Sequence, residues 1–405
     1  MQKDKEDDII KSILERNAGQ GNADAQCTLG SIYSDGQSVP QNFEKALFWF
    51  EKAASQGHIT AQYNLACMYD NGRGISQDVE KAIYWYEKAA NQGDSNAQHN
   101  LGVIYHNGQG VPKDFEKAKY WYEKAAIQGD SNAQYNLGVI YDNGEGVIQN
   151  LKKAFEWYEK AAIQGHAMAQ YNLGIMYDQG EGVIQNLKKA FEWYEKAAIQ
   201  GHVGAQFNLA CMYHHGQGIT QDIERAIYWY EKAANQDASD AQFNLGLMYH
   251  EGENIPQDIS KAIYWYEKAT NQDNAEAQCN LAMIYHFGQD VPQNISQAIY
   301  WYEKAATQGH VKAQVNLSFI YFSGQGTTQD IKKAIYWCEK AANQGYAIAQ
   351  LNLGNMYFEL GNMYFYGQSV PKDIKKAKHW YKKATKQGYE EAQNILNKLM
   401  QKHKK

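Results

Sequence analysis

The sequence contains little cysteine, and its cysteines are not paired. Five cysteines occur in 405 residues, at irregular spacing and without a Cys-x-x-Cys motif. Disulfide-stapled domains and zinc sites use even numbers of cysteines or close pairs. We therefore expect free thiols at apolar positions of a protein from a reducing compartment.

Long apolar runs are also missing. No window approaches the roughly 18 apolar residues of a membrane-spanning helix. The N-terminal segment MQKDKEDDIIKSILERN is charged and lacks the apolar stretch of a signal peptide. We expect no membrane span, and a cytoplasmic location or delivery into a host by a route other than Sec export.

Positive charge is scarce outside the C-terminal end. The formal net charge is −6, and residues 372–405 contain 11 lysines against three acidic residues, a net of +8 that leaves −14 for the rest. Nucleic-acid-binding proteins present a basic face, so we expect no nucleic-acid partner. We interpret the lysine-rich end as a solvated terminal segment, with contact to an acidic surface as the alternative.

Catalytic motifs are absent from the sequence. There is no nucleophile elbow, phosphate-binding loop, dinucleotide fingerprint or HExxH motif. The Gly-x-Gly segments, such as Gly72-Arg73-Gly74, follow a predicted helix instead of a strand, so we interpret them as turns. We predict that the protein is not an enzyme and uses no cofactor.

One segment, DVEKAIYWYEKAANQGD at residues 78–94, recurs along the whole chain. All ten tryptophans fall at one position of this segment, the first nine 36 residues apart and the last after 43. A strict period of this length predicts an array of repeats with one continuous core. We number the repeats 1 to 10 by their tryptophans: Trp49, Trp85, Trp121, Trp157, Trp193, Trp229, Trp265, Trp301, Trp337 and Trp380.

The first half of each repeat is predicted to be a helix, helix A. In repeat 2, Ala61, Leu65, Met68 and Tyr69 share one helical face. The helix is expected to end at Gly72, because glycine readily adopts the left-handed conformation that closes a helix. Glycine occupies this position in all ten repeats.

The second half of each repeat is predicted to be helix B. It begins at Asp78 in repeat 2, and this position is Asn or Asp in all ten repeats, which is typical of an N-cap. Trp85 and Tyr86 are expected to fill the space between neighbouring helices. Asp237 and Asp273 replace the glycine that closes helix B, so those two turns are expected to be strained or differently shaped.

The two ends of the array need caps, because an unpaired end would expose an apolar face. We predict an N-terminal capping helix in residues 1–22, ten repeats in residues 23–388, and a C-terminal capping helix with a basic tail in residues 389–405. The residues expected to cover the first repeat are Ile9, Ile10, Ile13 and Leu14.

Repeat 10 contains a seven-residue insertion within residues 353–366. LGNMYFE at 353–359 is followed directly by LGNMYFYG at 360–367. Seven residues are close to two helical turns, so the insertion could lengthen helix A by about 10 Å without rotating its apolar face. A looped-out bulge is the alternative, and we favour the longer helix.

At this point the repeats resemble a known family. Segments such as AQYNLGVIYDNGEGVIQNLKKAFEWYEKAAIQGH at 133–166 resemble the Sel-1-like repeat, a relative of the tetratricopeptide repeat. The shared motifs are Leu-Gly-x-x-Tyr, Gly-x-Gly-Val, Asp-x-x-Lys-Ala and Trp-Tyr-x-Lys-Ala-Ala. The resemblance implies an all-α fold, a right-handed α/α superhelical solenoid of about ten 36-residue helix-turn-helix repeats with helix A on the concave side.

The resemblance also suggests a function. The family consists mostly of adaptors that assemble protein complexes, many of them bacterial and some in contact with a host. We therefore expect a monomeric, non-enzymatic scaffold for a protein or peptide partner. A cysteine-rich, secreted branch binds or hydrolyses β-lactams, so a cell-wall-ligand or β-lactam role is the alternative, although the paired cysteines of that branch are absent here.

The variable positions of helix A form the candidate partner site. Positions three, seven and ten, counted from the Ala-Gln pair that starts each helix A, share a helical face. We expect an exposed stripe that binds an extended peptide or a helix, with packing between adjacent A helices as the alternative for position seven. The residues of this helix-A stripe are Tyr63, His99, His106, Tyr135, Tyr171, Phe207, His214, Phe243, His250 and His286.

Amide side chains recur beside the stripe. Position two is glutamine and position four is nearly always asparagine, as in Gln62 and Asn64. Such amides could clamp the backbone of a bound peptide. Their uniformity favours the other interpretation, a ladder of hydrogen bonds between repeats.

The histidines could suggest a metal site. His214, His250 and His286 occupy one position in three successive repeats, close enough for two imidazoles to meet one zinc ion. No cysteine or carboxylate completes a tetrahedral ligand set at suitable spacing. We therefore predict no metal site.

Overall fold

The computed structural model describes residues 12–36, 39–252, 254–367, 372–386, 388 and 390–401. Every regular element in these residues is a helix, as the sequence predicted. The chain divides into two compact parts, residues 1–220 and 221–405, and each is described by itself. Within the described ranges, no helix is long and apolar enough to cross a membrane.

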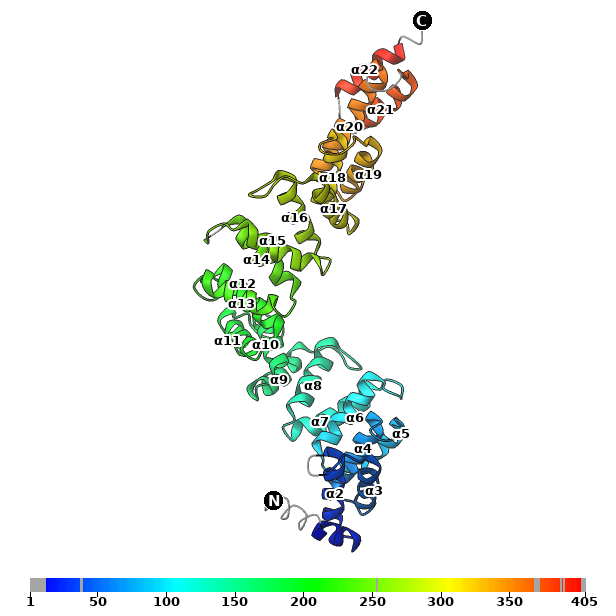
Figure 1. Ribbon diagram of the computed structural model, residues 1–405, viewed down its shortest axis with the longest axis vertical. Coiled ribbons are helices and arrows are strands. Elements are labelled where there is room, and N and C mark those ends of the chain that lie inside the picture. Colours follow the sequence, from blue (N-terminus) through cyan, green and yellow to red (C-terminus); the bar gives the residue numbers. More distant parts are fainter. Residues whose placement is uncertain are drawn as a thin grey trace. The chain divides into compact units, whose positions relative to one another are not determined.

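In the first part, helices A and B alternate, and each packs against the next one along the chain (Figure 1). The A helices are α2 (Ala23–Asp35), α4 (Ile59–Asn71), α6 (Ser95–Asn107), α8 (Ser131–Asn143), α10 (Ala167–Gln179) and α12 (Val203–His215). The B helices are α3 (Phe43–Ser55), α5 (Val79–Asn91), α7 (Phe115–Ile127), α9 (Leu151–Ile163) and α11 (Leu187–Ile199).

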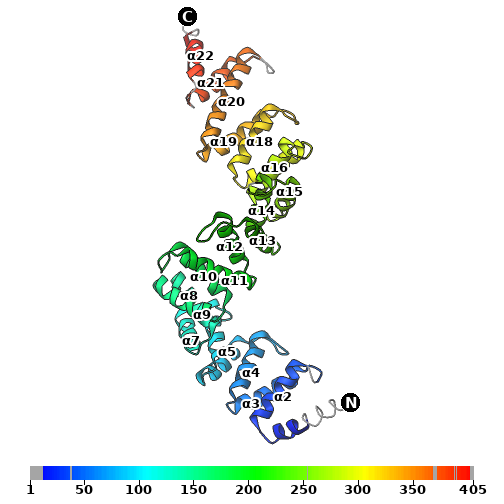
Figure 2. The same cartoon turned by 90° about the vertical axis from the view of Figure 1, so that its left-hand side faces the viewer.

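The second part has the same alternation, which Figure 2 shows from the side. The A helices are α14 (Ser239–Glu251), α16 (Ala275–Phe287), α18 (Val311–Ser323) and α20 (Ala347–Tyr366). The B helices are α13 (Ile223–Ala234), α15 (Ile259–Thr270), α17 (Ile295–Thr307), α19 (Ile331–Asn343) and α21 (Ile374–Lys386). A last helix, α22 (Glu390–Gln401), packs on α21.

The predicted ends of the helices are confirmed in repeat 2. Gly72 closes α4 in the left-handed conformation with φ 64°. The Oδ1 atom of Asp78 accepts a hydrogen bond from the Lys81 backbone amide at 3.0 Å, which satisfies one of the free amides at the start of α5. Sequence-local signals therefore set the boundaries of both helices.

The two turns that lack glycine differ from the others, as predicted. Asp237 and Asp273 adopt positive φ angles of 61° and 57°, whereas Gly93 in repeat 2 has φ 98°. The preceding helices α13 and α15 have 12 residues, one fewer than α5. Aspartate tolerates the left-handed region better than most residues, and the helix shortens to reach it.

The N-caps of helix A include histidines that we did not predict from the sequence. In four repeats the Nδ1 atom of the histidine before helix A accepts a hydrogen bond from a first-turn backbone amide, at 3.1 to 3.2 Å. In two other repeats the same position is aspartate, Asp94 and Asp130. The four capping histidines are His58, His166, His202 and His310.

These caps predict a pH-dependent stability. An imidazole accepts through Nδ1 only when that nitrogen is unprotonated, and burial lowers the pKa of His166 and His202. Their stabilisation is therefore complete above about pH 6.5, the unfolded-state pKa, and is lost as the pH falls below it. Thermal unfolding at pH 7 and pH 5 should show a smaller decrease for the double variant His166→Asp/His202→Asp than for the wild type. An equal decrease in both proteins would contradict this account.

The core is built on tyrosine more than on tryptophan. The tyrosine that follows each tryptophan is fully buried in most repeats, as Tyr86 is, whereas Trp85 is half-buried. Trp85 packs against the apolar clusters of repeat 1 and of repeats 2 to 4. Trp85 therefore fills the space between neighbouring helices, as expected, and it does so at the step between two repeats.

The insertion in repeat 10 forms the longer helix that we favoured. The single helix α20 has 20 residues, against 13 in α18. At the N-terminal end, residues 12–19 are helical. Leu14 packs against the core of repeat 1, but Ile13 is 54% exposed, so its predicted covering role is wrong. Ile9 and Ile10 lie outside the described residues, and the capping role of residues 1–22 stays a prediction.

Candidate partner-binding surface on the A helices

The ten stripe residues all lie on A helices, but they are less accessible than expected. Nine of them are half-buried and none is fully exposed. His286 is only 4% exposed, so the prediction of an exposed stripe is wrong for this residue. The burial arises because adjacent A helices approach each other along this face, which α2 and α4, α6 and α8, and α14 and α16 do.

The third-position side chains bridge neighbouring repeats. Tyr135 stacks on His166 with ring centroids 4.7 Å apart, and Tyr171 stacks on His202 at 4.3 Å. Each tyrosine thus contacts the histidine that caps the next helix A. One face of each tyrosine ring packs on this histidine. Because the tyrosines are only half-buried, part of each side chain remains at the surface.

The tenth-position side chains provide hydrogen-bond partners for the hydroxyl groups of the buried tyrosines of helix B. The Tyr158 hydroxyl donates to Asp142 at 3.1 Å, and in repeat 7 His250 lies 3.3 Å from the Tyr266 hydroxyl. Burial raises the pKa of Tyr158 well above its usual range, so the hydroxyl stays protonated and can donate. Buried tyrosine hydroxyls need such partners. In repeats 2 to 8, whose helix B carries this tyrosine, the tenth position is accordingly aspartate or histidine.

Several stripe histidines also reach the next repeat. His106 pairs with Glu145 at 2.8 Å, His99 lies 3.3 Å from the Asn136 amide, and His250 lies 2.8 Å from Gln289. Burial lowers the pKa of His99 and His286. Across the described ranges, no group of three or more His, Cys, Asp or Glu side chains is arranged to hold a metal ion.

The glutamines at position two form the predicted ladder between repeats. Gln98 donates to the Ala90 carbonyl of the preceding helix B at 2.9 Å, and its Oε1 atom accepts from Gln128 at 2.8 Å. The same pair of bonds recurs along the array, for example at Gln62 and Gln170. These amides are committed to the scaffold, so they do not clamp a ligand backbone.

The asparagines at position four also bind within the array. Asn100 donates to the Tyr86 hydroxyl at 3.1 Å, and Asn316 donates to the Tyr302 hydroxyl at 3.2 Å. Each bond joins one repeat to the preceding one. These asparagines are half-buried and lie next to the stripe residues on helix A.

A second set of exposed aromatic side chains lies on helix B, and we did not predict it from the sequence. Each is about half exposed and packs edge-to-face against the tryptophan that follows it. The signal was present, because an aromatic residue precedes the tryptophan in seven of the ten repeats. These residues are Phe48, Tyr84, Tyr120, Tyr228, Tyr264, Tyr300 and Tyr336.

The five cysteines are free thiols, as predicted. Cys27, Cys279 and Cys338 are buried, and burial raises the pKa of the Cys27 thiol to about 11. The thiols therefore stay protonated and act as small apolar side chains.

Comparison with known proteins identifies the repeat. The Sel1 repeat model matches ten consecutive segments: residues 23–58, 59–94, 95–130, 131–166, 167–202, 203–237, 239–274, 275–310, 311–346 and 347–389. Among curated proteins, none matches the chain.

Two solved structures are similar over most of their length. The first is c5321, described as a protective antigen present in uropathogenic Escherichia coli strains and displaying an SLR fold. It is 39% identical with a TM-score of 0.81, over 96% of this chain and 82% of that one. The second is a Sel1 repeat protein from Oxalobacter formigenes, 35% identical with a TM-score of 0.60, over 75% of this chain and 87% of that one.

Proposed function

The chain belongs to the Sel1 repeat family, whose fold is a scaffold for protein interactions, and we propose that it is a monomeric, non-enzymatic adaptor. It binds a protein or peptide partner through the helix-A stripe. Contact spreads over several repeats, as is usual for the extended surfaces of repeat proteins.

The single observation that supports this proposal is the variation of the stripe on an almost invariant frame. The glutamine ladder repeats with the same partners from one repeat to the next, and a tyrosine follows the tryptophan in eight of the ten repeats. The third position instead changes between tyrosine, histidine, phenylalanine, cysteine, valine and leucine. Aromatic side chains held rigidly by a neighbour are efficient anchors for a partner, because binding costs them little conformational entropy.

The description of a relative supports a proposal for the setting of the interaction. The similar structure from uropathogenic Escherichia coli is described as a protective antigen. We propose that the present chain is also bacterial and that its partner is met in contact with a host.

The test is capture of a partner by the purified full chain from lysates of the source cell and of a host. The double variant Tyr135→Ala/Tyr171→Ala is expected to weaken capture about tenfold or more, since aromatic anchors dominate interface energetics. The matched control is Tyr84→Ala/Tyr120→Ala, which removes two exposed tyrosines from helix B and should leave capture unchanged. Because Tyr135 and Tyr171 also stack on histidines, circular dichroism must show that the stripe variant is folded. Undiminished capture by a folded stripe variant would sink the proposal.

A further inference from the structure

A regular repeat uses one tyrosine of helix A to contact two B helices. In repeat 2, the Tyr69 hydroxyl donates to Glu51 of the preceding helix B, α3, at 3.4 Å. The carbonyl of the same residue accepts a hydrogen bond from the Asp78 amide, at the start of its own helix B, at 2.9 Å. One copy of the Leu-x-x-Met-Tyr segment therefore fixes both neighbours at the same height along helix A.

The insertion divides these two contacts between two copies of the segment. In α20, the hydroxyl of Tyr357 in the first copy donates to Glu339 of the preceding helix α19. The carbonyl of Tyr364 in the second copy accepts from the Asp373 amide before α21, at 2.8 Å. Helices α19 and α21 are therefore attached to α20 seven residues apart, which corresponds to about 10 Å along the helix axis.

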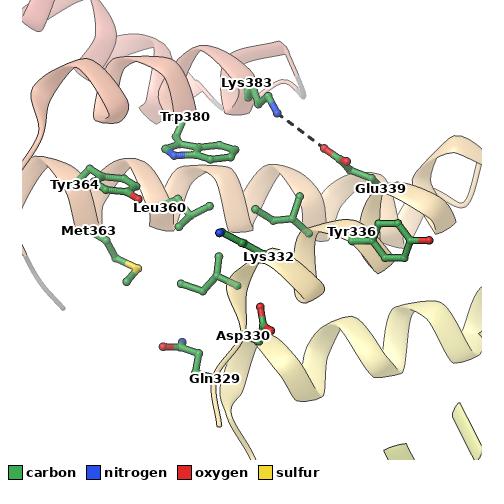
Figure 3. Close-up of a pocket in the computed structure, with 12 residues that line it drawn as sticks. Gln329, Asp330, Lys332, Tyr336, Glu339, Leu360, Met363, Tyr364, Trp380 and Lys383 are labelled. Carbon is green, nitrogen blue, oxygen red and sulfur yellow. Dashed lines mark ion pairs between the residues drawn. The ribbon is translucent and has the colours of Figure 1, made fainter. Parts of the chain in front are cut away.

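This offset leaves a pocket of about 690 Å³ between α19, α20 and α21 (Figure 3). Its size is within the range of binding sites for small ligands and side chains. Met363, from the second copy, is half-buried in it, whereas Met68 and Met176 at the same helix-A position are each 3% exposed. The other lining residues include Ile331, Lys332, Glu339, Leu360, Trp380 and Lys383.

Other repeats show what normally lies against the start of helix B. The loop between helices A and B of the next repeat approaches so closely that a Cβ atom on Gly326 would lie 2.6 Å from Ile295, the first residue of α17. Gly74 has the same relation to Phe43, the first residue of α3. The aliphatic residue that follows, Ile75, packs on the same core.

Ile331 holds the position of Ile295 in α19, and there it lines the pocket. In the other repeats described above, the first residue of helix B is thus covered by a loop of the next repeat, which in most repeats has small residues followed by Val or Ile. In repeat 10 the loop after helix A begins only at Gly367, two turns further along α20 than in a 13-residue helix.

We propose that this pocket binds a loop or extended segment of a partner protein that inserts a valine or isoleucine side chain between Ile331, Leu360 and Trp380. The inserted side chain takes the place that the chain's own loop occupies in regular repeats. The pocket includes no residue of the helix-A stripe, so it is a second site that stands or falls separately from the proposed function.

The charged groups of the pocket indicate an acidic residue in the same partner segment. Glu339 already pairs with Lys383 at 3.9 Å, and Asp330 caps α19 through the Lys333 amide at 3.0 Å. Figure 3 shows the Lys332 side chain directed into the pocket. No carboxylate of the described residues pairs with Lys332, which leaves its ammonium group available to the partner.

The probe is a synthetic peptide with the sequence of residues 143–150, NGEGVIQN, which has the small residues, an acidic residue and Val147. The full-length protein is labelled with ¹³C at its methionine methyl groups, and the Met363 signal is assigned with the variant Met363→Leu. The peptide is expected to shift the Met363 signal with a dissociation constant on the order of 1 mM. A peptide with Val147→Ser should bind several-fold more weakly.

Two variants locate the binding. Deletion of residues 353–359 restores the 36-residue spacing and removes the offset, so it should abolish the shift in a protein that remains folded by circular dichroism. Lys332→Glu should weaken binding several-fold, whereas Lys340→Glu, on the same helix outside the pocket, should not. The proposal is overturned if the peptide does not shift the Met363 signal. It is also overturned if the peptide shifts methionine signals of the deletion variant as much as it shifts those of the wild type. A Met363 shift caused by raising the protein concentration without peptide would also overturn it, because the occupant would then be a second copy of the chain.

Discussion

Replacing Tyr86 with alanine is expected to lower the free energy of unfolding by about 3–5 kcal/mol, the usual cost of removing a large aromatic side chain from a core. Tyr86 is fully buried, and its hydroxyl contacts Asp70 at 3.3 Å and accepts from Asn100 of the next repeat. The variant therefore loses packing within repeat 2 and a hydrogen bond to repeat 3. Urea unfolding monitored by circular dichroism measures the change.

The matched control is two residues away on the same helix. Tyr84 is 51% exposed and packs edge-to-face on Trp85 with ring centroids 5.0 Å apart. Tyr84→Ala is expected to cost less than about 1 kcal/mol, as exposed positions usually do. Similar costs for the two variants would show that the assigned core of the repeat is wrong.

Replacing Gln98 with leucine is expected to cost about 1–3 kcal/mol, because it leaves buried hydrogen-bonding groups without partners. Gln98 is 4% exposed, donates to the Ala90 carbonyl and accepts from Gln128. Leucine has a similar volume, so the loss reports the hydrogen bonds more than the packing. Hydrogen exchange of the amides in α5 and α6 should accelerate together, because the bond from Gln98 to the Ala90 carbonyl joins these two helices.

Gln350 provides the comparison for Gln98 at the same position of repeat 10. Its side chain is exposed, and its bond to the Ala342 carbonyl is longer, at 3.4 Å. Gln350→Leu should therefore change the unfolding free energy by less than about 1 kcal/mol. If Gln98→Leu were equally mild, the ladder would be a consequence of the packing and not one of its causes.

The parts of the fold that the sequence predicted are the ones fixed by local chemistry. Asp78 and Gly72 could be placed as helix caps because the backbone geometry of a helix end needs an oxygen acceptor or a left-handed residue within a few positions. The longer helix α20 was predictable because seven residues keep the apolar face in phase. The capping histidines were missed because imidazole acts as an acceptor only in one protonation state and is uncommon at this position.

The parts that the sequence could not predict depend on distances between repeats. Trp85 and Tyr86 are adjacent and similar in size, and only the position of the neighbouring helices decides that Tyr86 is buried and Trp85 half-buried. The same distances bury His286 within the stripe. Periodicity placed the stripe residues on one face, but it could not measure how much of that face the next repeat covers. Likewise, it predicted the long helix but not the pocket beside Met363.

The most direct measurement of the central claim is site-specific photocrosslinking in the presence of a source-cell or host lysate. A photoreactive phenylalanine analogue is placed at Tyr135 or Tyr171 on the helix-A stripe, and at Tyr84 or Tyr120 on helix B as controls. The account predicts that one protein is crosslinked from both stripe positions and from neither control position. Crosslinks from the helix-B positions alone would contradict it and would place the interaction surface on the exposed tyrosines of helix B.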